Sequence, residues 1–228
     1  MYCSIIIPIY NPSPQIATII TERFTALKDQ IDGDIELVMI DDGSQTDISD
    51  IKKITEHFPN AKLILQKSNK GKGAALRNGM ASANGDIILY TDTDFPYTIE
   101  SILNIIDGLK SNAKMAIGVR SESYFSKIPL KRKLISNILK LMNRICMSLP
   151  TKDTQAGLKA FKKEVLPIFL STKTDGFLFD LEFLQKIKKQ DISCTLVEIE
   201  LREGIELSEV KLGSLWKELK TYVGLINA

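Results

Sequence analysis

Residues 85–94 read Gly85-Asp86-Ile87-Ile88-Leu89-Tyr90-Thr91-Asp92-Thr93-Asp94, and this stretch decides the fold. The apolar run 86–90 predicts a short buried strand, with a glycine before it and Pro96 after it. Asp92 and Asp94 follow one residue apart, and in an extended chain both side chains leave the same face. Such a pair suits Mg²⁺ or Mn²⁺, with substrate phosphates completing the coordination shell. The alternative is a turn in which both aspartates only cap the strand end.

Strands and helices alternate on both sides of this stretch. The patterns predict strands at 4–9, 35–40, 61–66, 86–90 and 113–119, and helices at 14–29, 47–57, 73–83 and 98–110. Ser13 is the expected N-cap of the first helix, with Pro14 at its first position. This alternation predicts an α/β fold with a Rossmann-like, mostly parallel central sheet and helices on both faces. Ligands of such sheets bind beyond the carboxyl ends of the strands, where polar loops follow strand after strand here.

The second half of the chain has a different pattern. Residues 131–149 predict a basic amphipathic helix, which either packs on the core with a solvated cationic face or meets an anionic membrane surface or lipid phosphate. Further expected elements are a strand at 158–161, a helix at 164–170 and a second helix that opens within 175–183 and runs to about Lys188. A strand at 192–201 and a helix at 213–224 follow. We therefore expect one domain over 1–228, in which a smaller β/α half (121–228) follows the first half (1–120).

Length and composition exclude several classes of protein. The chain has 228 residues, 44% of them hydrophobic and 25% charged, which is ordinary for a soluble globular protein. A net charge of +2 gives no sign of a nucleic-acid partner. The 3 cysteines are far apart, which favours a reducing compartment over a zinc site or disulfides. The start does not read as a signal peptide, and no run is long enough to cross a bilayer. We expect a cytoplasmic protein whose contact with membranes is peripheral or through a partner.

Two loops in the first half carry groups that suit a nucleotide. Asp41-Asp42-Gly43-Ser44 offers carboxylates to a base or ribose, although it also reads as an N-cap and turn. Lys70-Gly71-Lys72-Gly73, with Arg77, offers amides and cations to a diphosphate. Its spacing is not that of a Walker loop, and the glycines are equally consistent with close helix–strand packing.

Candidates in the second half concern the acceptor. Asp153 precedes a predicted strand and is the best candidate to act as base or to align the acceptor, although it is also a plausible turn residue. Asp180 and Glu182 follow an aromatic-rich turn, and one or both are expected to face the same cavity. Arg202 and Lys211 are candidates to close over a departing diphosphate, or are ordinary surface ion pairs. The only histidine, His57, gives little support to a histidine triad or a zinc site.

Taken in order, these pieces resemble family 2 glycosyltransferases with the GT-A fold, and most closely the dolichol- or polyprenyl-phosphate sugar synthase branch. The resemblance covers most of the chain, and its motifs are loose singly but specific together. The matching segments are Ile7-Pro8-Ile9-Tyr10-Asn11, Asp41-Asp42-Gly43-Ser44, 69–74 with 77–79, Asp92-Thr93-Asp94 with Pro96, Gly118-Val119-Arg120, 153–161, Gly176-Phe177, Phe179-Asp180 and Glu182. Two departures are Pro12, where the family often has an acidic residue, and the lack of the membrane helices that many relatives carry after the position of Ala228.

The resemblance implies that 1–120 is the nucleotide-sugar-binding half of the domain and 121–228 the acceptor-binding half. It also implies roles for individual residues. Pro8, Tyr10 and one of Asp41 or Asp42 would contact the base and ribose, and Asp92 and Asp94 would bind the diphosphate through Mg²⁺ or Mn²⁺. Arg120 would lie near a phosphate and Asp153 at the acceptor, while Ser208 would belong to the segment that covers the diphosphate. Asp153 and Asp94 are the expected catalytic residues. The expected substrate-binding residues are Pro8, Tyr10, Asn11, Asp41, Asp42, Lys72, Arg77, Asp92, Thr93, Arg120, Gln155, Asp180, Arg202, Ser208 and Lys211.

The implied reaction is an inverting transfer of a sugar from a nucleoside-diphosphate sugar. A lipid-phosphate acceptor is already ionised, so that Asp153 would position it, whereas a sugar hydroxyl on a glycan would need Asp153 as a base. The basic helix favours the lipid phosphate. A sugar nucleotidyltransferase would show a glycine-rich loop directly after the first strand, where Tyr10-Asn11-Pro12 stands instead. A non-catalytic nucleotide-binding subunit is the remaining alternative, and the intact carboxylates argue against it. The base, the sugar and the oligomeric state stay open.

Overall fold

The computed structural model describes residues 2–110, 112–121, 149, 151, 153–154 and 156–205. Several predictions concern residues outside these ranges. They are the basic helix over 131–149 (except Leu149), the terminal helix at 213–224, and the site residues Gln155, Ser208 and Lys211.

The core of the molecule is one seven-stranded sheet with the order β3-β2-β1-β4-β6-β5-β7. Its strands are β1 (Tyr2–Ile9), β2 (Asp34–Asp41), β3 (Ala61–Leu65), β4 (Ile87–Tyr90), β5 (Met115–Arg120), β6 (Lys159–Lys162) and β7 (Cys194–Ile199). Pairing is parallel between β1 and β2, β1 and β4, β2 and β3, and β5 and β7. The mostly parallel sheet is therefore confirmed. It arises because β-branched and apolar runs such as Ile5-Ile6-Ile7 are buried on both faces.

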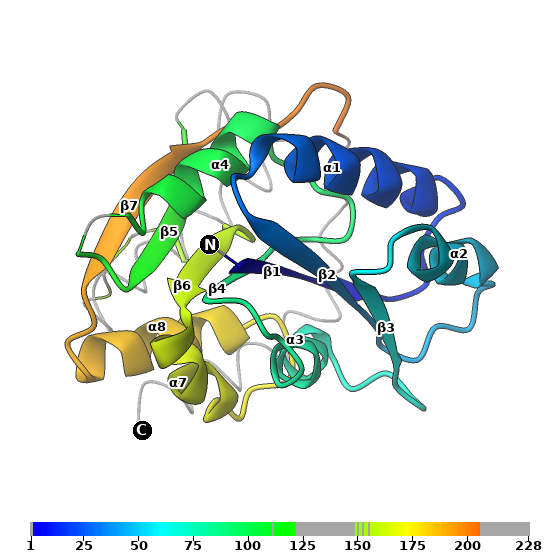
Figure 1. The fold of residues 1–228 in the computed structure, drawn as a ribbon. Coiled ribbons are helices and arrows are strands. Elements are labelled where there is room, and N and C mark those ends of the chain that lie inside the picture. The colour runs from blue at the N-terminus through cyan, green and yellow to red at the C-terminus, as the bar shows by residue number, and fades with distance from the viewer. Residues whose placement is uncertain are drawn as a thin grey trace.

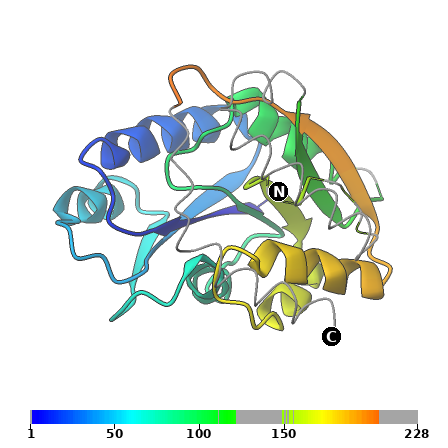
Figure 2. The ribbon, with the colours of Figure 1, turned by 180° about the vertical axis from the view of Figure 1, so that it is seen from behind.

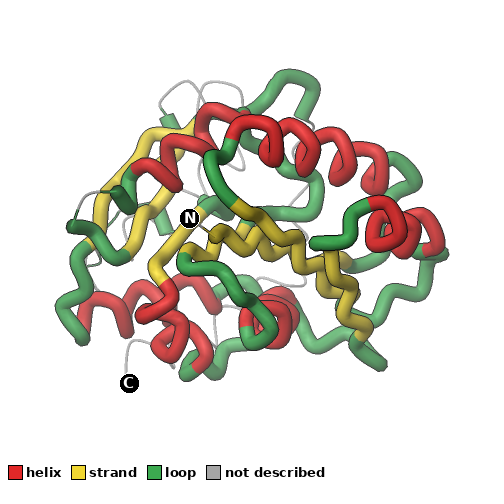
Figure 3. The backbone as a smooth tube through the Cα atoms, viewed as in Figure 1, coloured by secondary structure: helices red, strands yellow, loops and turns green. Residues whose placement is uncertain are grey.

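Helices cover both faces of the sheet (Figures 1 and 2). They are α1 (Ile16–Gln30), α2 (Ser49–His57), α3 (Lys72–Met80), α4 (Ile99–Asp107), η1 (Lys163–Val165), α7 (Leu166–Leu170) and α8 (Phe179–Lys189). One apolar cluster joins α1, α2 and α4 to one face of the sheet, and a second joins α3, α7 and α8 to the other. The layers are clear in the tube view, where helices lie above and below the strands (Figure 3).

Strand β6 is antiparallel to both of its neighbours, β4 and β5. In the register, Lys159 at the start of β6 lies opposite Tyr90 at the end of β4. The residues just before β6 therefore reach the same sheet edge as the residues just after β4. This inserted strand brings Asp153 to the carboxyl edge of the parallel strands, the edge at which the loop of Asp92 and Asp94 also lies.

Two local predictions were wrong. Helix α1 begins at Ile16 with Gln15 as N-cap, not at Pro14, because residues 13–15 first form a turn closed by the Ile16 N–H on the Ser13 carbonyl at 3.0 Å. Asp92 and Asp94 do not share the face of an extended strand. Strand β4 ends at Tyr90, and a turn follows in which the Phe95 N–H donates to the Asp92 carbonyl at 3.0 Å. Phe95 itself takes a positive φ of 43°.

Within the part of the chain that the structure describes, none of the helices has both the length and the apolar character that a bilayer crossing requires.

Candidate functional site

Side-chain hydrogen bonds link the loop that follows β1 to the loop that follows β2. The Asn11 N–H donates to Ser44 Oγ, and the Gln45 N–H donates to Asn11 Oδ1, both at 2.8 Å. Asn11 holds a positive φ of 46°, which asparagine tolerates better than most residues. Asn11 thus links the first two loops, and its predicted contact with substrate stays a prediction.

Asp41 and Asp42 have different partners. Asp42 is 3% exposed and accepts the backbone N–H groups of Lys70 and Gly71, both at 2.8 Å. Asp41 is 4% exposed and accepts the Ser44 N–H at 3.2 and 3.3 Å. Asp42 therefore braces the glycine loop before α3, while Asp41 closes its own turn. The structure leaves their contacts with a base or ribose as predictions.

The turn after β4 is fixed from two sides. Thr93 Oγ1 donates to the carbonyl of Pro8 at the end of β1. Arg202, just after β7, donates from Nη2 to the Asp94 carbonyl at 3.3 Å and from Nε to the Phe95 carbonyl at 3.2 Å. Thr93 and Arg202 thus hold the backbone that presents the two carboxylates.

Charge around these carboxylates is unevenly compensated. Asp92 Oδ1 forms an ion pair with the Lys72 ammonium at the start of α3. Burial lowers the pKa of Lys72, but the negative charges of Asp92, Asp180 and Asp94 outweigh it and hold that pKa above its ordinary value. Burial, followed by the charge of Asp92, raises the pKa of Asp94. Asp94 therefore carries anionic charge that the protein itself compensates poorly.

Asp92 and Asp94 are the residues that fit a divalent cation. Within the described ranges, there is no group of three or more His, Cys, Asp or Glu side chains placed to hold a metal ion. Two carboxylates are nevertheless the usual protein share of a Mg²⁺ site that substrate phosphates complete. Burial raises the pKa of Asp94 most and the like charge of Asp92 raises it further, and a cation bound by both carboxylates would offset that like charge.

Asp153 is held by Arg120, the last residue of β5. The Arg120 backbone N–H and Nε donate to Asp153 Oδ2 at 3.0 and 2.8 Å, and Nη2 donates to Oδ1 at 2.5 Å. The side chains are only 10% and 4% exposed. Two predicted site residues from distant parts of the sequence are thus brought together, as a two-oxygen pair between a guanidinium and a carboxylate.

The start of α3 packs closely on the segment before α8. A Cβ at Gly71 would lie 2.5 Å from the Asp175 carbonyl oxygen, and Gly71 has a φ of +103°, so that only glycine fits. Arg77 donates to the Thr174 carbonyl at 2.8 Å and pairs with Asp175. The glycines therefore serve close packing, and the Arg77 guanidinium holds this segment. Binding of diphosphate by Arg77 stays a prediction.

Glu182 and Asp180 both lie on the first turn of α8, but their carboxylates accept hydrogen bonds from different segments. Glu182 accepts the N–H groups of Lys173, at 2.9 Å, and Thr174, at 2.7 Å, and so fixes the segment before the helix. Asp180 is 6% exposed and accepts the Tyr90 hydroxyl at 2.5 Å and the Lys159 ammonium at 3.1 Å. Burial, followed by the charge of Asp180, raises the pKa of Tyr90 well above 10, so that its phenol stays a donor.

Sequence reasoning did not single out Lys159, Gly157 or Tyr97 as site residues. A lysine within an apolar strand was the available signal for Lys159. Gly157 donates its N–H to the Tyr97 hydroxyl at 3.0 Å and lies against the Asp92 carboxylate. Tyr10, a predicted substrate-binding residue, directly follows β1 and is 49% exposed.

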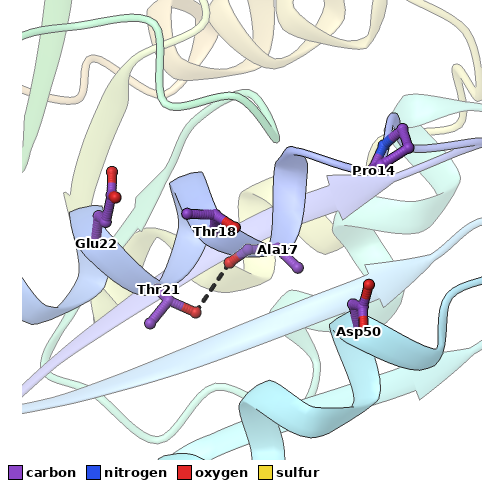
Figure 4. A pocket seen from close by; sticks show the side chains of 6 residues that line it. All are labelled: Pro14, Ala17, Thr18, Thr21, Glu22 and Asp50. Carbon is purple, nitrogen blue, oxygen red and sulfur yellow. Dashed lines mark hydrogen bonds between the residues drawn. The ribbon is translucent and has the colours of Figure 1, made fainter.

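A separate open hollow of about 410 Å³ lies between α1 and α2 (Figure 4). It is lined by Pro14, Ala17, Thr18, Thr21, Glu22 and Asp50. None of the predicted site residues contributes to it, and it carries no group suited to chemistry beyond two carboxylates on its rim.

Comparison with known proteins identifies a family whose sequence pattern the chain matches. The pattern of the family described as Glycosyl transferase family 2 matches residues 4–168. Among curated relatives, dolichyl-phosphate beta-glucosyltransferase of Saccharomyces cerevisiae is 28% identical over 206 residues, covering 81% of this chain and 62% of the relative. Dolichol-phosphate mannosyltransferase of Pyrococcus furiosus is 28% identical over 211 residues, covering 90% of this chain and 57% of the relative. The chain thus spans about three fifths of the length of these two relatives.

Among solved structures, glucosyl-3-phosphoglycerate synthase from Mycobacterium tuberculosis, in complex with Mn²⁺, uridine diphosphate and glucosyl-3-phosphoglycerate, superposes with a TM-score of 0.63. The identity is 17%, and the match covers 98% of this chain and 78% of that one. At this identity the likeness shows the fold.

Proposed function

The chain belongs to glycosyl transferase family 2, and from this membership we propose that it transfers a sugar from a nucleoside-diphosphate sugar to a polyprenyl or dolichyl phosphate at a membrane surface. Its fold is the GT-A fold that the sequence predicts. The observation that carries the proposal is that Asp92, Asp94 and the Arg120–Asp153 pair lie at the same edge of the sheet.

The donor side of the proposed site is the turn of Asp92 and Asp94. Lys72 pairs with Asp92, and the loops after β1 and β2 end at the same edge of the sheet, which suits a nucleoside diphosphate with its negative charges. A divalent cation held by Asp92 and Asp94 would neutralise charge on the departing diphosphate. Solved structures with a similar fold contain Mn²⁺ or Mg²⁺ together with uridine diphosphate, which supports this choice of cofactor.

The acceptor side is the Arg120–Asp153 pair. In an inverting transfer, the acceptor oxygen attacks the anomeric carbon in line with the leaving group, and orientation supplies a large part of the rate. Both Asp153 oxygens already accept hydrogen bonds from Arg120. That arrangement suits a residue that positions an acceptor better than one that removes a proton. It therefore favours an ionised phosphate over a sugar hydroxyl, in agreement with the dolichyl-phosphate substrates named for the curated relatives.

The test is transfer by the purified full chain in detergent with short-chain polyprenyl phosphate. UDP-glucose and GDP-mannose are supplied in turn, each with Mn²⁺ or EDTA, and the lipid-linked sugar is separated and quantified. We expect product with one donor, dependent on the metal and abolished in Asp94→Asn. A glycan with free hydroxyls is supplied in parallel as a second acceptor, and transfer to the glycan alone would replace the lipid-phosphate assignment. Lack of transfer with unchanged nucleotide binding would favour the non-catalytic alternative.

A further inference from the structure

Lys159 is a fully buried cation to which the proposed reaction gives no direct role. Its side chain is 0% exposed, on the sheet face that α3 and α8 cover. The ammonium donates to the carbonyls of Thr154 at 3.2 Å and Ala156 at 2.7 Å, and to Asp180 at 3.1 Å. An ammonium has three N–H donors, so these contacts use all of them.

The pair is anchored from two further elements. Asp180 belongs to the first turn of α8, and the Tyr90 hydroxyl at the end of β4 donates to the same oxygen at 2.5 Å. Tyr90 and Lys159 also lie opposite each other in the β4–β6 ladder, with the ammonium 5.7 Å from the ring centroid. The position of the ammonium is therefore determined by the sheet and by α8 together.

Both carbonyls that Lys159 binds belong to the segment in front of β6. At one end of that segment, Asp153 pairs with Arg120. At the other end, Gly157 packs against the carboxylate of Asp92. The backbone that Lys159 holds thus joins the acceptor carboxylate to a carboxylate of the proposed metal site. A change in this backbone would alter both their separation and their relative orientation.

We propose that Lys159 is a positioning residue of the transfer reaction: it fixes the backbone at Thr154 and Ala156 and so sets Asp153 against the donor carboxylates. This inference rests on the proposed function. Stability alone does not explain the pair, because well-packed apolar side chains replace buried ion pairs without loss in many proteins. An apolar side chain, however, has no donors for two backbone carbonyls. The charge at position 159 is thus tied to the geometry of this segment.

The test compares two neutral pairs at the same positions. Lys159→Met with Asp180→Asn removes both charges together, keeps the Tyr90 contact and leaves the two carbonyls without their donor. Lys159→Gln with Asp180→Asn is equally neutral but retains an N–H donor. The matched control is Lys62→Met with Glu36→Gln, which removes the ion pair of a buried carboxylate at the opposite edge of the sheet. For each folded variant, kcat, donor KM, Mn²⁺-dependent nucleotide affinity and amide exchange of Thr154, Ala156 and Gly157 are measured.

We expect the methionine variant to lose about 100-fold in kcat, with nucleotide affinity nearly unchanged and amide exchange increased. The glutamine variant should regain part of kcat, and the control pair should lose stability only. An unchanged kcat, or an equal loss in the control, would overturn the inference. If the wild type transfers no sugar, the proposed function fails by itself. In that case, unchanged amide exchange in the methionine variant would separately overturn the role of Lys159. If the methionine variant fails to fold, kcat and amide exchange are measured on the glutamine variant.

Discussion

Gly157 lies directly against the carboxylate of Asp92. A Cβ built at Gly157 would overlap Asp92 Oδ2 and lie 3.1 Å from Cγ. The segment of the proposed acceptor carboxylate and the strand-end turn of the proposed metal site are therefore in van der Waals contact. Any side chain at position 157 must move the Asp92 carboxylate away from its present place.

The first prediction follows from this contact. In Gly157→Ala, the Asp92 carboxylate is displaced, since it is the end of a side chain and yields more easily than backbone. We expect a Tm change of only a few degrees with a loss of Mn²⁺-dependent nucleotide affinity of about 10-fold or more. Titration calorimetry with and without EDTA measures it. Gly108→Ala is the control, because its Cβ would meet Thr195 Cγ2 at 2.9 Å, Val197 Cγ2 at 3.2 Å and the Ile105 carbonyl oxygen at 3.3 Å, all away from the site.

The second prediction concerns stability and Asp94. Because the pKa of Asp94 is raised in the folded chain, the native state binds more protons than the unfolded state between the ordinary and the raised value. Stability therefore falls as the pH rises through that window, and above it the ionised Asp94 is unfavourable. We expect Asp94→Asn to raise Tm at pH 7 and the gain to vanish below about pH 3.9. A lower Tm at pH 7 would contradict this electrostatic account.

The third prediction concerns the same residue in binding. A cation needs the ionised carboxylate, so Mn²⁺-dependent nucleotide binding should weaken as the pH falls, and should do so at a higher pH than an ordinary aspartate would give. Affinity measured between pH 4 and pH 8 shows this. In Asp94→Asn the metal-dependent part should be absent throughout. A metal-dependent affinity that persists in this variant would remove Asp94 from the metal site.

Much of the site's location was predictable, while its internal contacts were not. Alternation of strands and helices placed the loops of Asp41 and Asp92 at one sheet edge, because parallel strands end there together. The pairing of Arg120 with Asp153 depends on β6 entering antiparallel between β4 and β5. No local pattern states that direction. The burial of Lys159 likewise depends on α8 packing over it, which is a property of tertiary structure.

The fourth prediction concerns Glu36, at the edge of the sheet opposite to the site. Its carboxylate is 1% exposed and accepts hydrogen bonds from Ser4 at 2.6 Å, Lys62 at 2.7 Å and the Asn84 N–H at 2.6 Å. Burial alone would raise its pKa, but these hydrogen bonds outweigh burial and lower the pKa to about 2. Since the folded value lies below the unfolded one, Glu36 stabilises the fold above about pH 4.5 and loses this contribution as the pH falls toward 2.

We therefore expect Glu36→Gln to lower the free energy of unfolding by about 2–3 kcal/mol at pH 7. The difference from wild type should shrink steadily as denaturation is repeated at lower pH. Nucleotide affinity should stay the same, because Glu36 lies far from the strand ends that carry the site. A difference that does not depend on pH would show that the carboxylate charge is not the cause.

The last prediction separates geometry from charge at Arg120. Arg120→Lys keeps a positive charge beside Asp153 but has no planar fork to bind both of its oxygens. If Asp153 positions the acceptor, a point charge is not enough, and we expect kcat to fall by about 10- to 100-fold with nucleotide affinity unchanged. Steady-state transfer kinetics with polyprenyl phosphate, alongside nucleotide titration, measures both quantities. Asp153→Asn should behave in the same way, because the amide cannot accept from Arg120 with both of its atoms. A loss of donor affinity in either variant would instead move this pair to the donor side of the site.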